Sequence, residues 1–136
     1  MTNAGPYVAV VDDEASVRTA LGRLLRLADY EVVAFGCGEA FLLSAANRRP
    51  DCAIVDIHLD GLSGFDVKAR LNALHGKVPV VFITASDDTA LDKSVADAGG
   101  VALLRKPFSN DALVEAVKAA LRHRATEDGC DNDSPA

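Results

Sequence analysis

The sequence predicts an α/β fold in which five parallel strands form one doubly wound sheet with helices on both faces. Two observations predict this class. Short runs rich in Val, Ile and Leu alternate along the chain with longer segments whose apolar residues recur every three or four positions. Several of the short runs are apolar at consecutive positions, which suits parallel strands covered on both faces. With right-handed crossovers, we expect the flavodoxin-like strand order 2-1-3-4-5.

Five short apolar runs are the expected strands, because each is too short for a helix and is bounded by turn residues. They cover Tyr7 to Val11, Glu31 to Phe35, Cys52 to Val55, Val78 to Ile83 and Val101 to Leu104. The fourth run is the most continuous, because large apolar side chains follow one another without a polar break from Val80 to Ile83.

The expected helices follow these strands. An apolar period of three to four residues is clearest over Val17 to Ala28 and over Leu113 to Leu121. The period is weaker in three other segments, 39–46, 64–74 and 88–98. The last of these carries only Leu91 and Val95 as large apolar residues, so we expect this fourth helix to be loosely held.

The length of 136 residues fits one domain, since a typical domain has about 100 to 200 residues. We expect the folded domain to cover residues 6–124. From residue 125 onward the sequence ATEDGCDNDSPA holds acids but no base and no large apolar side chain. Such a segment buries too little surface to offset the entropy of ordering, so residues 125–136 are expected to form an acidic disordered tail.

The composition argues against several classes of function. With 14 Lys and Arg against 20 Asp and Glu the net charge is -6, so we expect no direct binding to nucleic acid. No apolar run approaches the roughly 18 residues of a membrane span, and the N-terminus does not resemble a signal peptide. We therefore expect a cytoplasmic protein without membrane contact. Cys37, Cys52 and Cys130 show no CxxC spacing and are expected to be free thiols.

Polar side chains stand at the ends of four of the five expected strands. In an open α/β sheet, ligands bind beyond the carboxyl ends of the strands. The residues found there are Asp12 and Asp13, Asp56, Thr84 and Lys106. Taken singly, each has a structural explanation, since an aspartate can cap a helix or form a turn and a lysine can be a solvated surface charge. Their conjunction at four strand ends favours one shared site.

The three carboxylates of that site predict a bound cation. Two carboxylates about 4 Å apart repel by roughly 4 kcal/mol at an effective dielectric of about 20, and the single ammonium of Lys106 is too little for three acids. Oxygen-only ligands suit Mg²⁺, which keeps several waters and leaves room for a phosphoryl oxygen. Because a strand-end aspartate can itself be the nucleophile and form an acyl phosphate, these residues predict phosphoryl transfer.

Four motifs occur in order along the chain: VVDDE at Val10 to Glu14, IVDIHLDGLSG at Ile54 to Gly64, ITA at Ile83 to Ala85 and RKPF at Arg105 to Phe108. In order and spacing they resemble the receiver (CheY-like) domain of bacterial two-component response regulators. The resemblance covers about residues 6–124, and the sequence looks most like receivers of the FixJ group. Each motif alone is weak, but the ordered set is highly specific.

The resemblance implies that Asp56 accepts a phosphoryl group from a phosphohistidine on a sensor histidine kinase. It also implies a Mg²⁺ site in which Asp13 and Asp56 are ligands and Asp12 acts largely through bound water. The backbone carbonyl of His58 is the further ligand that the family pattern implies.

Lys106 and Thr84 have implied roles around the phosphoryl group. Lys106 would neutralise one phosphoryl oxygen and Thr84 would hydrogen-bond another, so both groups meet the charge that spreads over these oxygens during transfer. In this family the bond from Lys106 to Pro107 is a cis peptide. The resemblance further implies that the protein is a phosphorylation-dependent switch that binds an unknown downstream protein and is not a conventional enzyme. A homodimer is also possible under this resemblance.

Three departures from the family pattern stand out. The position three before Lys106, usually an aromatic switch residue, is Leu103, which has neither a ring to swing nor a hydroxyl. The Met-Pro pair that often follows the phosphoacceptor is replaced by Leu59 and Asp60, which adds an acid near the metal site. The positions that tune phosphoryl lifetime in this family are His58 and Ser86.

Two alternatives remain at this point. The first is a degenerate receiver that never meets phosphate and serves as a constitutive docking module, which Leu103 and Asp60 suggest. The second is a small haloacid-dehalogenase-like phosphatase, which also uses a strand-end aspartate with Mg²⁺. That family requires a second aspartate two positions after the nucleophile, where this chain has His58.

Overall fold

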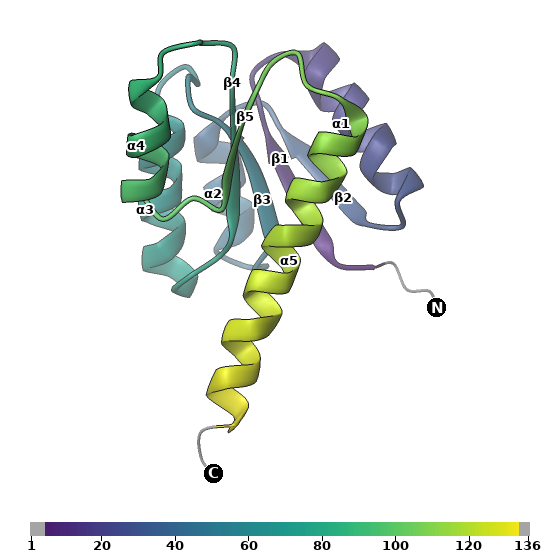
Figure 1. The fold of residues 1–136 in the computed structure, drawn as a ribbon, viewed down its shortest axis with the longest axis vertical. Coiled ribbons are helices and arrows are strands. Elements are labelled where there is room, and N and C mark those ends of the chain that lie inside the picture. Colours follow the sequence, from purple (N-terminus) through teal and green to yellow (C-terminus); the bar gives the residue numbers. More distant parts are fainter. Residues whose placement is uncertain (1–4, 134–136) are drawn as a thin grey trace.

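The computed structural model describes residues 5–133, with side chains up to Arg122. Within this part of the chain, five strands and five helices alternate (Figure 1). They are β1 (Tyr7–Val11), α1 (Ala15–Leu27), β2 (Glu31–Phe35), α2 (Gly38–Ala45), β3 (Cys52–Asp56), α3 (Gly64–His75), β4 (Val80–Thr84), α4 (Ala90–Asp97), β5 (Ala102–Arg105) and α5 (Asn110–Asp133).

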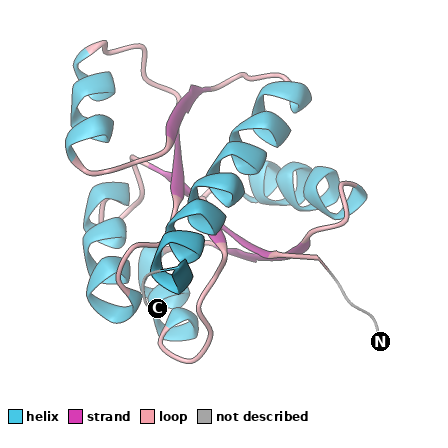
Figure 2. Ribbon diagram, turned by 60° about the horizontal axis from the view of Figure 1, so that its bottom comes forward, coloured by secondary structure: helices cyan, strands magenta, loops and turns pink. Residues whose placement is uncertain are grey.

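The strands form one parallel sheet in the order β2-β1-β3-β4-β5, which confirms the predicted fold class and strand order. In the centre of the sheet, Val10 of β1 lies opposite Ala34 of β2 and Ile54 of β3. Helices α1 and α5 cover one face, and α2, α3 and α4 cover the other (Figures 1 and 2).

Alternate side chains of the strands enter two separate apolar layers. Val8 and Val10 of β1 pack into the layer beneath α1 and α5, together with Leu25 and Val117. Ala9 of β1 and its odd-numbered neighbours pack into the layer beneath α2, α3 and α4. Strands β1, β3 and β4 are buried along their whole length, so both faces select apolar residues and the runs do not alternate.

The observed bounds of the fourth strand differ from the predicted run. We expected a strand from Val78, but β4 begins at Val80. Pro79 has no N–H to give to a ladder, although its carbonyl accepts the N–H of Ala53 at 3.0 Å. The apolar run from Val78 to Ile83 therefore begins two residues before the strand that pairs in the sheet.

The two C-terminal helices bear on two further predictions. Val95 is the only residue of α4 that is buried, in line with its sparse apolar pattern. Helix α5 continues to Asp133, although we expected a disordered tail from residue 125. Extending a packed helix adds a hydrogen bond per residue without a new nucleation, which favours this continuation. Residues 134–136 lie outside the described part, and the domain limit at residue 124 stays a prediction.

No helix within residues 5–133 is long and apolar enough to span a bilayer.

Candidate functional site

Three aspartates meet at the carboxyl edge of the sheet. Asp12 and Asp13 follow β1, and Asp56 is the last residue of the neighbouring β3. One carboxylate oxygen of each lies within 4.8 Å of the other two. Asp12 and Asp56 are buried, whereas Asp13 is exposed to solvent. The structure thus brings together the carboxylates that the sequence placed at separate strand ends.

Backbone turns fix the orientation of two of these carboxylates. Asp12 Oδ1 accepts the N–H of Glu14 at 2.9 Å, and Asp56 Oδ1 accepts the N–H of His58 at 2.8 Å. The start of α3 packs tightly against the end of β3, since a Cβ on Gly64 would lie 2.5 Å from the carbonyl oxygen of Asp56. Glycine at this position lets the helix approach the end of the strand.

Lys106 is the cationic partner of the aspartates. Its Nζ lies 2.9 Å from Asp12 Oδ2 and 2.9 Å from Asp56 Oδ2. A third acid, Glu14, places Oε1 3.1 Å from the same ammonium. Burial alone would lower the pKa of Lys106, but its contacts with the three carboxylates outweigh this and raise that pKa above its ordinary value. Lys106 therefore carries its full charge at neutral pH.

Among the buried side-chain oxygen and nitrogen atoms of the described residues, Asp12 Oδ2 is the one without a hydrogen-bond partner. It is buried and has no partner in hydrogen-bond geometry, although Lys106 Nζ is 2.9 Å away. We interpret the contact as an ion pair whose angle does not make a hydrogen bond. An oxygen in this state keeps a lone pair for another electropositive group.

The oxygen donors of the site fit a hard divalent ion. The cluster offers one oxygen from each of three aspartates, and an oxygen-only set of this kind suits Mg²⁺. Asp13 faces solvent, where an ion can keep several waters. The side chain of His58 is exposed, and its backbone lies beside Asp56 through the 2.8 Å hydrogen bond.

Thr84 is fully buried at the end of β4, beside the strand that leads to Lys106. The N–H of Lys106 donates to the carbonyl of Thr84 at 2.7 Å. Thr84 Oγ1 accepts the N–H of Ser86 at 3.1 Å, which leaves the hydroxyl proton available to donate. No hydrogen bond joins Thr84 to the aspartates among the described residues. The bond from Lys106 to Pro107 is cis, as the resemblance implied.

Sequence reasoning missed two residues around the site. Glu14, which contacts Lys106, stands next to the two aspartates and could have been found by the same strand-end rule. Arg105 lies in β5 opposite Thr84, and its side chain holds the loop that follows Thr84 by hydrogen bonds. The guanidinium donates to the carbonyl of Ser86 at 3.2 Å and to that of Asp88 at 2.8 Å. No sequence spacing pointed to those backbone partners.

Comparisons with known proteins agree on one protein family. The family model for the response regulator receiver domain matches residues 8–118. Nodulation protein W of Bradyrhizobium diazoefficiens is 38% identical over 113 residues, which are 83% of this chain and 50% of that protein. The transcriptional regulatory protein PrrA of Mycobacterium tuberculosis is 40% identical over 123 residues, or 89% of this chain and 52% of PrrA.

A solved structure supports the same relationship. FixJ-N is 29% identical and superposes with a TM-score of 0.79, over 90% of this chain and 97% of FixJ-N. The chain spans about half the length of the curated relatives it matches. With the ordered motifs, the acidic cluster and the strand order all in agreement, the chain belongs to the response regulator receiver domain family of two-component signalling.

Proposed function

We propose that Asp56 accepts a phosphoryl group from a phosphohistidine of a sensor histidine kinase. Receiver domains of response regulators interact with histidine kinases, which supplies the class of donor. One observation carries the proposal. Asp56 lies inside the three-aspartate cluster with its Oδ2 2.9 Å from Lys106 Nζ, so a nucleophilic carboxylate stands beside a cation-binding group and a fixed ammonium.

In the proposed transfer, a carboxylate oxygen of Asp56 attacks phosphorus as the bond from phosphorus to the kinase imidazole breaks. The electron pair of that bond returns to the imidazole nitrogen, and Asp56 becomes an acyl phosphate. Negative charge spreads over the outer phosphoryl oxygens in the transition state. Lys106 offers a full positive charge to one oxygen, and Thr84 has a hydroxyl proton to donate to another.

Receiver domains typically bind Mg²⁺ at an acidic pocket, and the donors of this chain fit that ion. We propose that Asp13, Asp56 and the backbone carbonyl of His58 are ligands, and that Asp12 acts through bound water. Mg²⁺ held by these ligands would supply positive charge to the carboxylates and to an entering phosphoryl group. The hydrogen bond from His58 N–H to Asp56 Oδ1 holds the turn of His58 against the phosphoacceptor.

Response regulator receiver domains are signalling proteins and are generally not enzymes. The proposed role is accordingly a switch in the cytoplasm whose phosphorylation changes the affinity for a downstream protein. Helix α4 suits the movable part of such a switch, because it holds only one buried side chain, Val95. Shifting a two-state switch from 1:99 to 99:1 needs about 5.5 kcal/mol of preference, which several charge-assisted hydrogen bonds to phosphate can approach.

Intact-protein mass after incubation with a small acyl phosphate and Mg²⁺ tests the proposal. The parent chain should gain one phosphoryl group, and Asp56→Asn should gain none. Removal of Mg²⁺ with a chelator should abolish the gain as well. Asp60→Asn is the matched control, because it deletes an exposed acid close by that is not part of the cluster, and it should keep the gain.

The alternatives give different results in the same experiment. A gain that survives Asp56→Asn contradicts the assignment of the phosphoacceptor. No gain by the parent, even with a kinase supplied, would instead favour a constitutive docking module. Sustained hydrolysis of small phosphate esters that depends on Asp56 would favour the hypothesis of a haloacid-dehalogenase-like phosphatase.

A further inference from the structure

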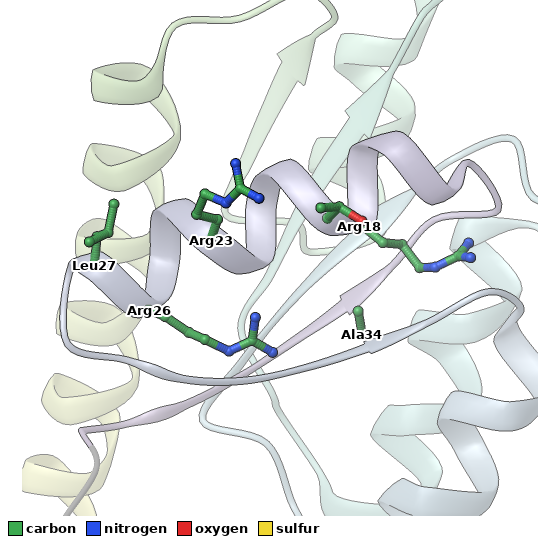
Figure 3. A pocket seen from close by; sticks show the side chains of 6 residues that line it. Arg18, Arg23, Arg26, Leu27 and Ala34 are labelled. Atoms are coloured by element: carbon green, nitrogen blue, oxygen red, sulfur yellow. The ribbon is translucent and has the colours of Figure 1, made fainter.

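Helix α1 carries three arginines, Arg18, Arg23 and Arg26, on the side that faces the edge strand β2. A hollow of about 600 Å³ lies between α1 and β2. Its lining consists of Arg18, Thr19, Arg23, Arg26, Leu27 and Ala34 (Figure 3). None of these is acidic, although the whole chain has a net charge of -6.

The three guanidinium groups have no carboxylate partner among the described residues. Arg18 Nη1 donates to the carbonyl of Asp12 at 2.7 Å, and Arg26 Nη2 donates to the carbonyl of Val32 at 3.1 Å. Arg23 makes no described polar contact. Each guanidinium has five N–H donors, so most donors of Arg18 and Arg26 stay available. The contacts with backbone carbonyls hold these two groups in place without neutralising them.

The positions of Arg18 and Arg26 on α1, and their contacts with the separate carbonyls of Asp12 and Val32, indicate how long a bridging ligand must be. The two residues are eight positions apart on α1, which is about 12 Å along the axis. Figure 3 shows both side chains reaching from α1 toward β2, one on each side of Ala34. A single phosphate or carboxylate is too short to contact both. In an extended peptide, two side chains four residues apart are separated by about 13 Å, which matches.

The neighbouring strand can pair with an extended chain. Within the described part of the chain, strand β2 is at the edge of the sheet and pairs only with β1. The N–H of Glu31 donates to the carbonyl of Pro6, and the carbonyl of Phe35 accepts the N–H of Asp12, so both residues direct backbone groups toward β1. In a parallel ladder the backbone groups of alternate residues point to opposite sides, so those of Val32 and Ala34 point away from β1, toward the free edge of the sheet. Arg26 donates to the carbonyl of Val32, so of these outward groups the N–H and C=O of Ala34, an exposed residue, are the ones left to pair with a further strand.

We propose that the groove between α1 and β2 binds an extended acidic peptide segment of a partner protein. Two carboxylates four residues apart bind Arg18 and Arg26, and the peptide backbone between them pairs with Ala34. Arg–carboxylate pairs supply the charge complementarity, and the short stretch of edge backbone sets the extended conformation. This surface adjoins the proposed phosphorylation site through Arg18, which donates to the backbone carbonyl of Asp12. The proposal uses none of the aspartate carboxylates and does not depend on phosphorylation.

Fluorescence anisotropy with a labelled peptide tests the groove on the full chain. The probe is Gly-Glu-Val-Thr-Val-Glu-Gly, whose glutamates are four residues apart, and it should bind saturably and more weakly as salt rises. The same peptide with lysines should not bind, and one with adjacent glutamates should bind about tenfold more weakly because it reaches one arginine only. These comparisons require no variant of the protein.

Variants then assign the binding to the two arginines. Arg26→Gln and the double change with Arg18→Gln should weaken the peptide stepwise, by about tenfold or more for the pair. Arg70→Gln is the matched control, because it removes an exposed arginine of α3 on the other face of the sheet, and it should leave the affinity unchanged. Equal binding by the double variant, equal binding of both glutamate spacings, or no saturable binding would overturn the proposal. Binding of inorganic polyphosphate but not of the peptide would also overturn it, in favour of a polyphosphate site.

Discussion

Replacing Lys106 by Met is expected to lower the free energy of unfolding by about 3 kcal/mol at neutral pH without Mg²⁺. Lys106 Nζ lies 2.9 Å from one oxygen each of Asp12 and Asp56, both of which are buried. Each contact corresponds to roughly 6 kcal/mol of attraction at an effective dielectric of about 20, and desolvation cancels much of it. Met keeps the apolar stem, so the change deletes the ammonium and leaves two buried carboxylates without their partner.

Urea unfolding followed by circular dichroism measures this loss. Lys118→Met is the control, since its ammonium is 3.9 Å from Glu115 on the surface of α5 and should contribute less than about 1 kcal/mol. Mg²⁺ should stabilise the Lys106→Met variant more than the parent, because the ion replaces the lost positive charge. At a concentration about a hundred times its Kd, a ligand of the native state adds about 2.7 kcal/mol.

The pH dependence of the same difference is a second check. Because the pKa of Lys106 is raised in the native state, its stabilisation is fully present below the ordinary lysine pKa of 10.5 and is lost only as pH rises through the higher native value. The gap between parent and variant should therefore persist across neutral and mildly alkaline pH. A loss below about 1 kcal/mol, or equal stabilisation of both proteins by Mg²⁺, would refute the view that the ammonium holds the carboxylates together.

Three further outcomes are expected. Asp13→Asn should weaken Mg²⁺ binding in calorimetry by about tenfold or more, whereas Asp60→Asn should change it little. Arg105→Gln should speed amide hydrogen exchange over residues 86–92 more than elsewhere, because the guanidinium binds two carbonyls of that segment; unchanged exchange there would contradict the role. Burial raises the pKa of Cys52 from 9.0 to about 12, so between these values the unfolded chain loses a proton that the native state keeps. The free energy of unfolding should then fall by about 1.4 kcal/mol per pH unit in that window, and a Cys52→Ala variant should show a shallower slope.

Much of the fold could be predicted because three of the five strands are buried on both faces. Burial on both sides of β1, β3 and β4 selects consecutive apolar residues, and that pattern is visible in the sequence. The edge strand β2 was also found, although Val33 and Ala34 are exposed, because β-branched residues bounded by turn residues remain a strand signal. The end of α5 was harder, since a helix that is already packed can continue through residues with weak preferences.

The acidic part of the site could be predicted because it follows from topology. Parallel strands end at the same edge of the sheet, so Asp12, Asp13, Asp56 and Lys106 had to meet once the strand order was known. The strand-end rule also places Glu14 near this edge, but it does not predict that Glu14 shares the ammonium of Lys106. That contact depends on the conformations of two long side chains beyond the ends of the strands.

Arg105 connects the end of β5 to the loop after Thr84 and to Asp92 of α4. The family pattern instead directs attention to Leu103, where an aromatic side chain is usual, and a leucine there suggests a weakened connection. Two residues later, Arg105 reaches across to the carbonyls of Ser86 and Asp88 and also pairs with Asp92 at 3.3 Å. The same strand end bonds Thr84 through the N–H of Lys106. A displacement of the loop after Thr84 must therefore break or carry along the Arg105 contacts, whichever side chain occupies position 103.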